Sequence, residues 1–226
     1  MRIVALSDQH GQLPRVPSCD LLIVAGDVCP DGMGGFDART SPVEQWRWFE
    51  RRVRPWAAAV TAGRRILTWG NHDWCGEVEE FWSTPDPAEP GALEIVVDRE
   101  VQVPRPGRAP LRVWATPWSN RFMDWAFMKE PRDLVEVYAK IPAGIDILVS
   151  HQPPYGFGDR FPDRHDHVGS EALRDAIDRV RPRLVICGHI HGGRGRYEYD
   201  GIPIYNVSIL DDDYRPAFAP TVIELD

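Results

Sequence analysis

The sequence predicts an α/β fold in which two β-sheets pack face to face and helices cover their outer faces. Short apolar runs rich in Val, Ile and Leu recur along the chain, and each is too short for a helix. Amphipathic stretches with helix-capping signals lie between several of these runs. Other segments alternate apolar and polar residues between Pro, Gly and Asp turns, as hairpin strands do. We therefore expect one more parallel sheet and one more antiparallel sheet within a single sandwich.

Two kinds of strand are predicted. Continuous apolar runs, typical of strands buried on both faces, occur at Ile3–Ser7, Leu21–Ala25, Arg65–Trp69, Ile145–Ser150 and Leu184–Cys187. Alternating segments occur at Leu93–Val97, Val101–Val103, Leu111–Ala115, Tyr197–Tyr199, Pro203–Val207 and Thr221–Leu225.

Three segments have helical patterns. The first is Pro42–Ala62, where Ser41 suits the N-cap and Pro55 should break or kink the helix. The second is Pro131–Lys140, which has proline at its first position. The third is Ser170–Val180, which opens on a capping serine.

Length and composition indicate one globular domain spanning residues 1–226. Hydrophobic residues make up 43% and charged residues 27% of the chain, and the longest irregular stretch, Gln152–Gly169, is not a domain linker. The net charge of −8 argues against an extended nucleic-acid surface. No run of 18 apolar residues predicts a membrane span, and the N-terminus resembles a first strand, not a signal peptide.

The four cysteines lie far apart, with no CxxC pair. They are Cys19, Cys29, Cys75 and Cys187. Without an export signal, we expect reduced thiols in a cytoplasmic protein, neither disulfides nor a cysteine metal site.

Polar residues with metal-binding side chains follow the apolar runs. The clusters are Ser7-Asp8-Gln9-His10, Gly26-Asp27, Gly70-Asn71-His72-Asp73, Ser150-His151 and Gly188-His189-Ile190-His191. Five of the seven histidines fall in these clusters, at the edge of an α/β sheet where ligands bind. In Asp8-x-His10, and again in His189-x-His191, an extended backbone would place both side chains on one face. We expect glycines before the motifs to allow tight turns or close backbone approach.

These residue types predict a centre for two divalent ions. Carboxylate and imidazole together suit Mn, Fe, Zn or similar ions, whereas all-oxygen sets suit Mg or Ca. Seven donors exceed what one ion needs if water is also to bind. Two ions sharing one carboxylate would use them, and such pairs stabilise both oxygens of an in-line displacement at phosphorus.

The ordered series of clusters resembles the signature of the calcineurin-like metallophosphoesterases over nearly the whole chain. That resemblance implies an αββα sandwich of two mixed β-sheets flanked by helices. It implies that one metal is bound by Asp8, His10, Asp27 and His191, and the other by Asp27, Asn71, His151 and His189, with Asp27 bridging. Metal-bound hydroxide would attack phosphorus, His72 would contact the phosphate and protonate the leaving oxygen, and Asp73 would orient His72.

A narrower resemblance covers the C-terminal half. Its motifs include Pro117-Trp118, Ile141-Pro142-x-Gly144, His151-x-Pro153-Pro154 and Tyr205-Asn206-Val207-Ser208. They are similar to a small branch related to the vertebrate brain-expressed metallophosphoesterases, which hydrolyse 2′,3′- or 3′,5′-cyclic nucleotides, usually with Mn. This resemblance implies a phosphodiesterase with two divalent ions, Mn foremost, and Fe, Zn, Co or Ni as alternatives.

Several alternatives stay open at this point. Within the same superfamily, the alternatives to a phosphodiesterase are a phosphomonoesterase, a protein phosphatase and a nuclease. From another class, the alternative is a non-catalytic metal-binding regulatory protein. The intact His72-Asp73 pair argues against the last of these. The sequence does not fix the oligomeric state, and we expect no membrane partner.

Some residues have two interpretations. Trp118 and Phe157 either pack in the core or stack on a nucleobase. The loop residues Arg160, Arg164, His165 and His167 either are solvated or belong to the substrate mouth, and a third metal site there is the less favoured interpretation.

Overall fold

The apolar runs form the strands of two large sheets in the computed structural model, which describes residues 1–32, 41–82, 86, 88–161 and 166–226. The first sheet has the order β13-β1-β2-β3-β4. Its strands are β13 (Thr221–Glu224), β1 (Arg2–Leu6), β2 (Cys19–Ala25), β3 (Ala62–Thr68) and β4 (Glu94–Ile95). They run parallel except for the antiparallel edge strand β13, which pairs with β1.

The second sheet has the order β11-β12-β10-β9-β6-β5. Its strands are β11 (Gly195–Tyr199), β12 (Ile202–Asn206), β10 (Leu184–Cys187), β9 (Ile147–Ser150), β6 (Arg108–Thr116) and β5 (Arg99–Arg105). The expectation of a more antiparallel second sheet is wrong. The four central strands run parallel, and only the edge strands β11 and β5 are antiparallel to their neighbours. Alternating sequences belong here to strands near the sheet edges, not to a separate kind of sheet. A two-stranded sheet of β7 (Ser119–Asn120) and β8 (Met128–Lys129) was not predicted.

The predicted helices are present, and the first is interrupted. α1 (Pro42–Trp48) passes through a π-helical turn, η1 (Phe49–Val53), into α2 (Arg54–Ala59). The turn lies directly before Pro55, which lacks a backbone N–H and cannot make an α-helical hydrogen bond. α3 (Pro131–Ala139) and α4 (Glu171–Val180) are regular. Short 3₁₀ turns lie at η2 (Trp74–Glu77), η3 (Glu79–Phe81) and η4 (His191–Gly193).

Both predicted serine caps are confirmed. The Ser41 hydroxyl accepts a hydrogen bond from the Glu44 backbone N–H at 3.4 Å, and the Ser170 hydroxyl accepts one from the Leu173 N–H at 3.2 Å. Each cap satisfies a backbone donor that the first helical turn leaves without a partner.

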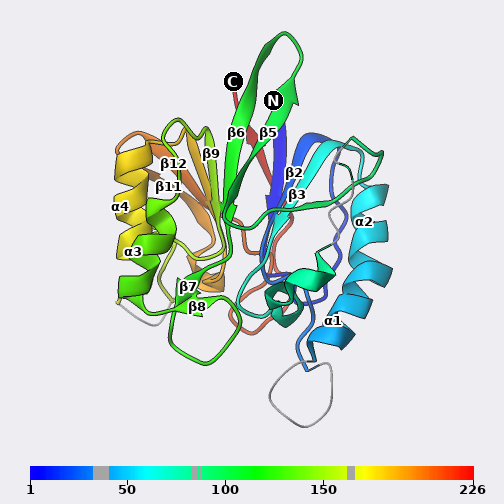
Figure 1. The fold of residues 1–226 in the computed structure, drawn as a ribbon, viewed down its shortest axis with the longest axis horizontal. Helices are drawn as coiled ribbons and strands as arrows, with labels where there is room; N and C mark the ends of the chain where they lie inside the picture. The colour runs from blue at the N-terminus through cyan, green and yellow to red at the C-terminus, as the bar shows by residue number, and fades with distance from the viewer. Residues whose placement is uncertain (33–40, 83–85, 87, 162–165) are drawn as a thin grey trace.

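Three apolar layers separate four layers of secondary structure. Between the sheets, alternate residues of β1 and β2 such as Ile3 and Ile23 pack against Ile147 and Ile186 of the second sheet. The other face of the first sheet packs on α1, η1 and α2, and the outer face of the second sheet packs on α3 and α4. Figure 1 shows α3 and α4 on one flank, α1 and α2 on the other and the sheets between them. The predicted αββα sandwich is confirmed.

Two further expectations concern the core and the membrane. Cys187 is fully buried on the outer face of the second sheet, as expected of a small core residue. Among the described helices, none has the length and apolar character that a membrane span needs.

Candidate active site

The carboxyl ends of the central strands of both sheets meet at one edge, and the predicted ligands lie there. They are Asp8 after β1, Asp27 after β2, Asn71 after β3, His151 after β9, and His189 and His191 after β10, with His10 two residues beyond Asp8. Segments from residue 8 to residue 191 therefore form one cluster, and the structure brings all seven predicted ligands together.

The backbone at four ligands is left-handed. The φ angles are 54° at Asp8, 40° at His10, 53° at Asp27 and 69° at His189. The expected extended Asp-x-His and His-x-His segments are therefore wrong, because each strand ends before its motif and the chain turns there. Such residues cost about 1–3 kcal/mol each and persist where the surroundings hold them. Here the Asp8 N–H donates to the Gly26 carbonyl and the His10 N–H to the Asp27 carbonyl, both at 3.0 Å.

Glycines allow these segments to pack closely, as predicted. A Cβ atom on Gly70 would lie 2.6 Å from both the Asp27 backbone nitrogen and the His151 ring, and would also clash with the Asp27 carboxylate. A Cβ atom on Gly188 would clash with the carboxylate of Asp8. The positions before these motifs are therefore restricted to glycine by the ligands beside them.

Asp8, His10 and His191 form the first group of possible ligands, with donor atoms within 4.8 Å of one another. The His191 Nε2 lies 3.6 Å from Asp8 Oδ1, and the His10 Nε2 lies 3.8 Å from Asp27 Oδ2. On the far side of its ring, His191 Nδ1 donates to the Asp211 backbone carbonyl at 2.8 Å. That bond fixes the tautomer and leaves Nε2 directed at the carboxylates.

Asp27, His151 and His189 form the second group. The His151 Nε2 lies 3.3 Å from Asp27 Oδ2 and 2.9 Å from Asn71 Oδ1. Its Nδ1 donates to the Ala25 carbonyl at 2.9 Å. Asp27 therefore lies between the two groups, in the position of the predicted bridging carboxylate.

These residues fit a pair of cations. A neutral His151, with its proton on Nδ1, would direct the Nε2 lone pair at oxygen atoms of Asp27 and Asn71, and a metal ion between these three atoms would bind all of them. The buried Nε2 of His10 has no hydrogen-bond partner in the described structure. Burial disfavours charge on His151 and His191, but the carboxylates Asp27 and Asp8 outweigh it and raise the pKa of each histidine to about 9.

Asp8 and His189 are held in the protonation states that bind metal. Burial would raise the pKa of Asp8, but the hydrogen bond and charge of His191 lower it to about 2. Burial, together with the charge of His151, lowers the pKa of His189 to about 3, so its ring is neutral. Two bound ions would polarise a phosphoryl oxygen and acidify a water molecule at this edge.

His72 is positioned by Asp31. Its Nδ1 lies 2.7 Å from Asp31 Oδ1, and the other oxygen of the same carboxylate lies 3.1 Å from His10 Nδ1. Burial works against charge on His72, but the carboxylates of Asp27 and Asp31 outweigh it and raise its pKa. The His72 backbone N–H also donates to Asp27 Oδ1 at 2.8 Å. The ring is thus fixed beside the ligand cluster, in a state suited to giving up a proton.

The predicted pairing of Asp73 with His72 is wrong. Asp73 is fully buried, and its carboxylate accepts hydrogen bonds from the backbone N–H groups of Val28, Cys29 and Gly70 at 2.9–3.3 Å. Burial, reinforced by the charge of Asp27, raises its pKa to about 6. Asp73 therefore joins the segment after β2 to the segment after β3 and does not contact the imidazole. The sequence feature that could have identified Asp31 as the partner of His72 is its position four residues after Asp27, in the same segment after β2.

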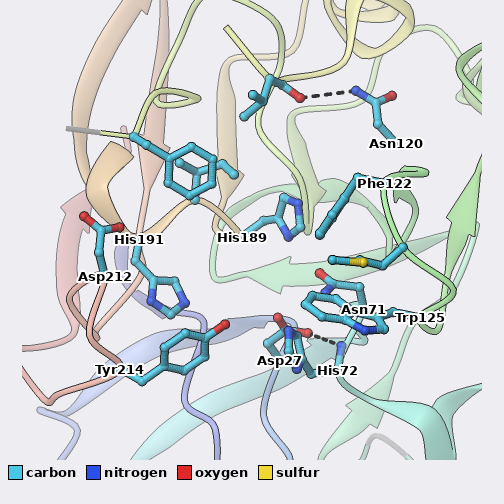
Figure 2. A pocket seen from close by; sticks show the side chains of 14 residues that line it. Asp27, Asn71, His72, Asn120, Phe122, Trp125, His189, His191, Asp212 and Tyr214 are labelled. Carbon is cyan, nitrogen blue, oxygen red and sulfur yellow. Dashed lines mark hydrogen bonds between the residues drawn. The ribbon is translucent and has the colours of Figure 1, made fainter. Parts of the chain in front are cut away.

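A pocket of about 650 Å³ opens over the ligand cluster. Figure 2 shows His72 and His189 facing it, with Phe122 and Trp125 on one side and Tyr214 on the other. Phe122 and Tyr214 were not predicted, because neither adjoins a recognised motif, and Trp125 belongs to the motifs of the narrower resemblance but had no predicted role. Tyr214 has a φ angle of 60°, in a turn where Asp211 Oδ1 accepts from the Asp213 and Arg215 N–H groups.

The two residues considered for base stacking are half-buried and pack against the core instead. Trp118 donates through its ring nitrogen to Asp98 at 2.6 Å and packs between two core clusters. Phe157 packs on the outer cluster beside Tyr199.

The loop considered for a third metal site is held by hydrogen bonds. The His167 Nδ1 donates to Asp159 Oδ1 at 2.7 Å, and its Nε2 accepts from Arg160 Nε at 3.1 Å. His167 and Arg160 are thus used within the loop, whereas Arg164 and His165 lie outside the described residues.

Known proteins resemble this chain in sequence and in fold. A sequence profile of the family described as calcineurin-like phosphoesterase matches residues 1–193. The human and mouse proteins named metallophosphoesterase domain-containing protein 1 are each 31% identical over 249 aligned residues, covering 99% of this chain and 71% of theirs. The solved structure of TT1561 of Thermus thermophilus shares the fold, with a TM-score of 0.52 and 12% identity over 91% of this chain and 88% of that one. The chain belongs to the calcineurin-like phosphoesterase family of metal-dependent hydrolases.

Proposed function

We propose that this hydrolase is a phosphodiesterase of small substrates, with 2′,3′- or 3′,5′-cyclic nucleotides foremost, and that it works with two Mn ions. The observation that carries the proposal is the position of His72, fixed by Asp31 beside two ligand groups, with Asp27 in one group and 3.8 Å from His10 of the other. A diester has a poor leaving group when the departing oxygen is an alkoxide. A protonated imidazole at that position meets this need.

The residues have separate roles in this scheme. Asp27 and the six other ligands would hold the ions, whose mixed oxygen and nitrogen donors suit Mn. His72 donates a proton to the departing oxygen, and Asp31 keeps its ring oriented and its pKa raised. Asp73 holds the two loops at their spacing.

The pocket supports a small substrate. It holds about 650 Å³, and half of its described lining residues are apolar or aromatic. The net charge of −8 does not favour an extended nucleic-acid strand. We propose the cytoplasm as the compartment, where Cys29 and Cys75, whose Sγ atoms lie 3.7 Å apart, would remain reduced thiols.

The test is turnover by metal-free protein reconstituted with Mn, measured on bis-p-nitrophenyl phosphate, p-nitrophenyl phosphate and both cyclic AMP isomers. The proposal expects hydrolysis of the diester and of one cyclic nucleotide, with little cleavage of the monoester. A preference for the monoester would place the protein with the phosphatases. Bound Mn without turnover of any of the four would favour a non-catalytic role. Parallel reconstitution with Fe, Zn, Co and Ni tests the choice of metal.

A further inference from the structure

Exposed apolar side chains gather at the mouth of the pocket. Eight large hydrophobic residues of the described structure are exposed, and four of them line the pocket. Those four are Phe122, Met123, Phe161 and Tyr214. Phe122 is 54% exposed and Tyr214 is 48% exposed. A concentration of apolar surface around one concave site is typical of a binding surface.

The aromatic side chains flank the chemical centre. The Trp125 ring lies 4.3 Å from the His72 ring, and Phe122 packs edge-on to Trp125 at 5.2 Å. The Tyr214 ring lies 4.8 Å from His10 and 4.9 Å from His191. Figure 2 shows these walls on opposite sides of the cluster, so a group attached to a bound phosphate would extend between them.

The segment that carries Phe122 and Trp125 is tied to the centre. It joins β7 to β8, and the Arg121 N–H donates to the Lys129 carbonyl at 2.8 Å. The Ala126 N–H donates to the carbonyl of Asn71 at 3.1 Å. The aromatic wall is therefore attached through the backbone to one of the metal-ligand residues and keeps a fixed position relative to it.

The charge of the pocket restricts what it accepts. None of the described lining residues is Lys or Arg, and Asp212 adds negative charge at the rim. A substrate with one phosphoryl group can be neutralised at the metal centre. A second phosphate in the pocket would meet aromatic rings and a carboxylate without a cationic partner in the described part of the lining.

We infer that the walls formed by Phe122, Trp125 and Tyr214 are a specificity site for a planar aromatic group attached to a single phosphate. This inference rests on the proposed function and names the organic part of its substrate. Aromatic rings bind a planar group through stacking and edge contacts, which a saturated ring of the same size cannot reproduce. A nucleobase is one group of this class, and stacking tolerates any base.

The test is binding of phosphonates, which have no hydrolysable ester bond, to the Mn-loaded protein by calorimetry. Phenylphosphonate should bind about tenfold more tightly than methylphosphonate and at least several-fold more tightly than cyclohexylphosphonate. Phe122→Ala should abolish most of the preference for the phenyl compound, and Phe122→Tyr should retain it. Phe218→Ala serves as the control, because Phe218 is exposed but does not line the pocket.

Two results would overturn the inference. Equal binding of phenyl- and cyclohexylphosphonate would show a merely apolar surface, and an unchanged preference in Phe122→Ala would show that this wall does not bind the ring. The readout is independent of turnover. A phenyl preference without hydrolysis of any diester would refute the proposed function alone, and hydrolysis without the preference would refute this inference alone.

Discussion

Binding of the two ions should release about two protons at neutral pH. His151 and His191 donate through Nδ1 to backbone carbonyls, and their Nε2 atoms face carboxylates that raise the pKa of each ring to about 9 against the opposing effect of burial. At pH 7 each ring is therefore about 99% protonated in metal-free protein. A ligating imidazole must be neutral, so each ion displaces one proton.

The sign of the pH dependence follows from these values. Below pH 9, each unit of falling pH should weaken the binding of each ion about tenfold, because one proton competes at each site. The stability of metal-free protein should change in the opposite sense. The contribution of the two charged histidines is fully present below pH 6.5 and is lost as the pH rises towards 9, so the melting temperature should fall over that range.

The assay is calorimetric titration of Mn at pH 7 in buffers of different ionisation enthalpy, where the slope counts released protons. The background is His72→Asn, because the pKa of His72 is also raised and would respond to the charge of the ions. His191→Asn should release about one proton instead of two. An unchanged slope after His191→Asn would refute the reasoning, since it would mean that His191 is already neutral in the metal-free centre, whereas a proton lost from metal-bound water is released in both proteins.

Three substitutions test other parts of the site. Gly70→Ala should abolish most Mn binding, because the added Cβ would occupy the space of the Asp27 carboxylate. The control is Gly201→Ala, whose added Cβ meets no atom within 4 Å; it should still bind Mn and lose about 1 kcal/mol of unfolding free energy. His72→Ala should lower kcat about 10²–10⁴-fold on a diester with an alkoxide leaving group, and much less on a diester with a nitrophenolate leaving group. Asp31→Asn should lower kcat with the same dependence on the leaving group. Equal losses on both substrates would exclude an acid role for His72. Asp73→Asn should lower the unfolding free energy by about 1–3 kcal/mol without changing the leaving-group dependence; a change in that dependence would restore the pairing with His72.

The ligands could be predicted from sequence because each follows a short apolar run. Parallel strands bring their carboxyl ends to one edge of each sheet. Face-to-face packing of the two sheets then places positions as distant as Asp8 and His191 together. The layered architecture followed from the same runs, together with the helix-capping signals at Ser41 and Ser170.

The contacts within the site could not be predicted in this way. Asp73 belongs to a recognised motif next to His72, whereas Asp31 lies four residues beyond Asp27, yet it is Asp31 that reaches the His72 ring and Asp73 that binds backbone N–H groups. Tyr214 comes from a turn near the C-terminus, and no local pattern shows that this turn lies over the ligands of another segment. Such pairings depend on three-dimensional packing between loops, which strand periodicity does not describe.

Each ligand group draws on both sheets. Asp8 and His10 come from the first sheet and His191 from the second, and Asp27 and Asn71 likewise oppose His151 and His189. Each ion would therefore be a cross-link between two layers that otherwise meet through apolar side chains and a few hydrogen bonds near this edge. Sliding one sheet over the other would break coordination bonds at the edge, so the loaded protein should resist mechanical shear in a direction where the metal-free protein yields.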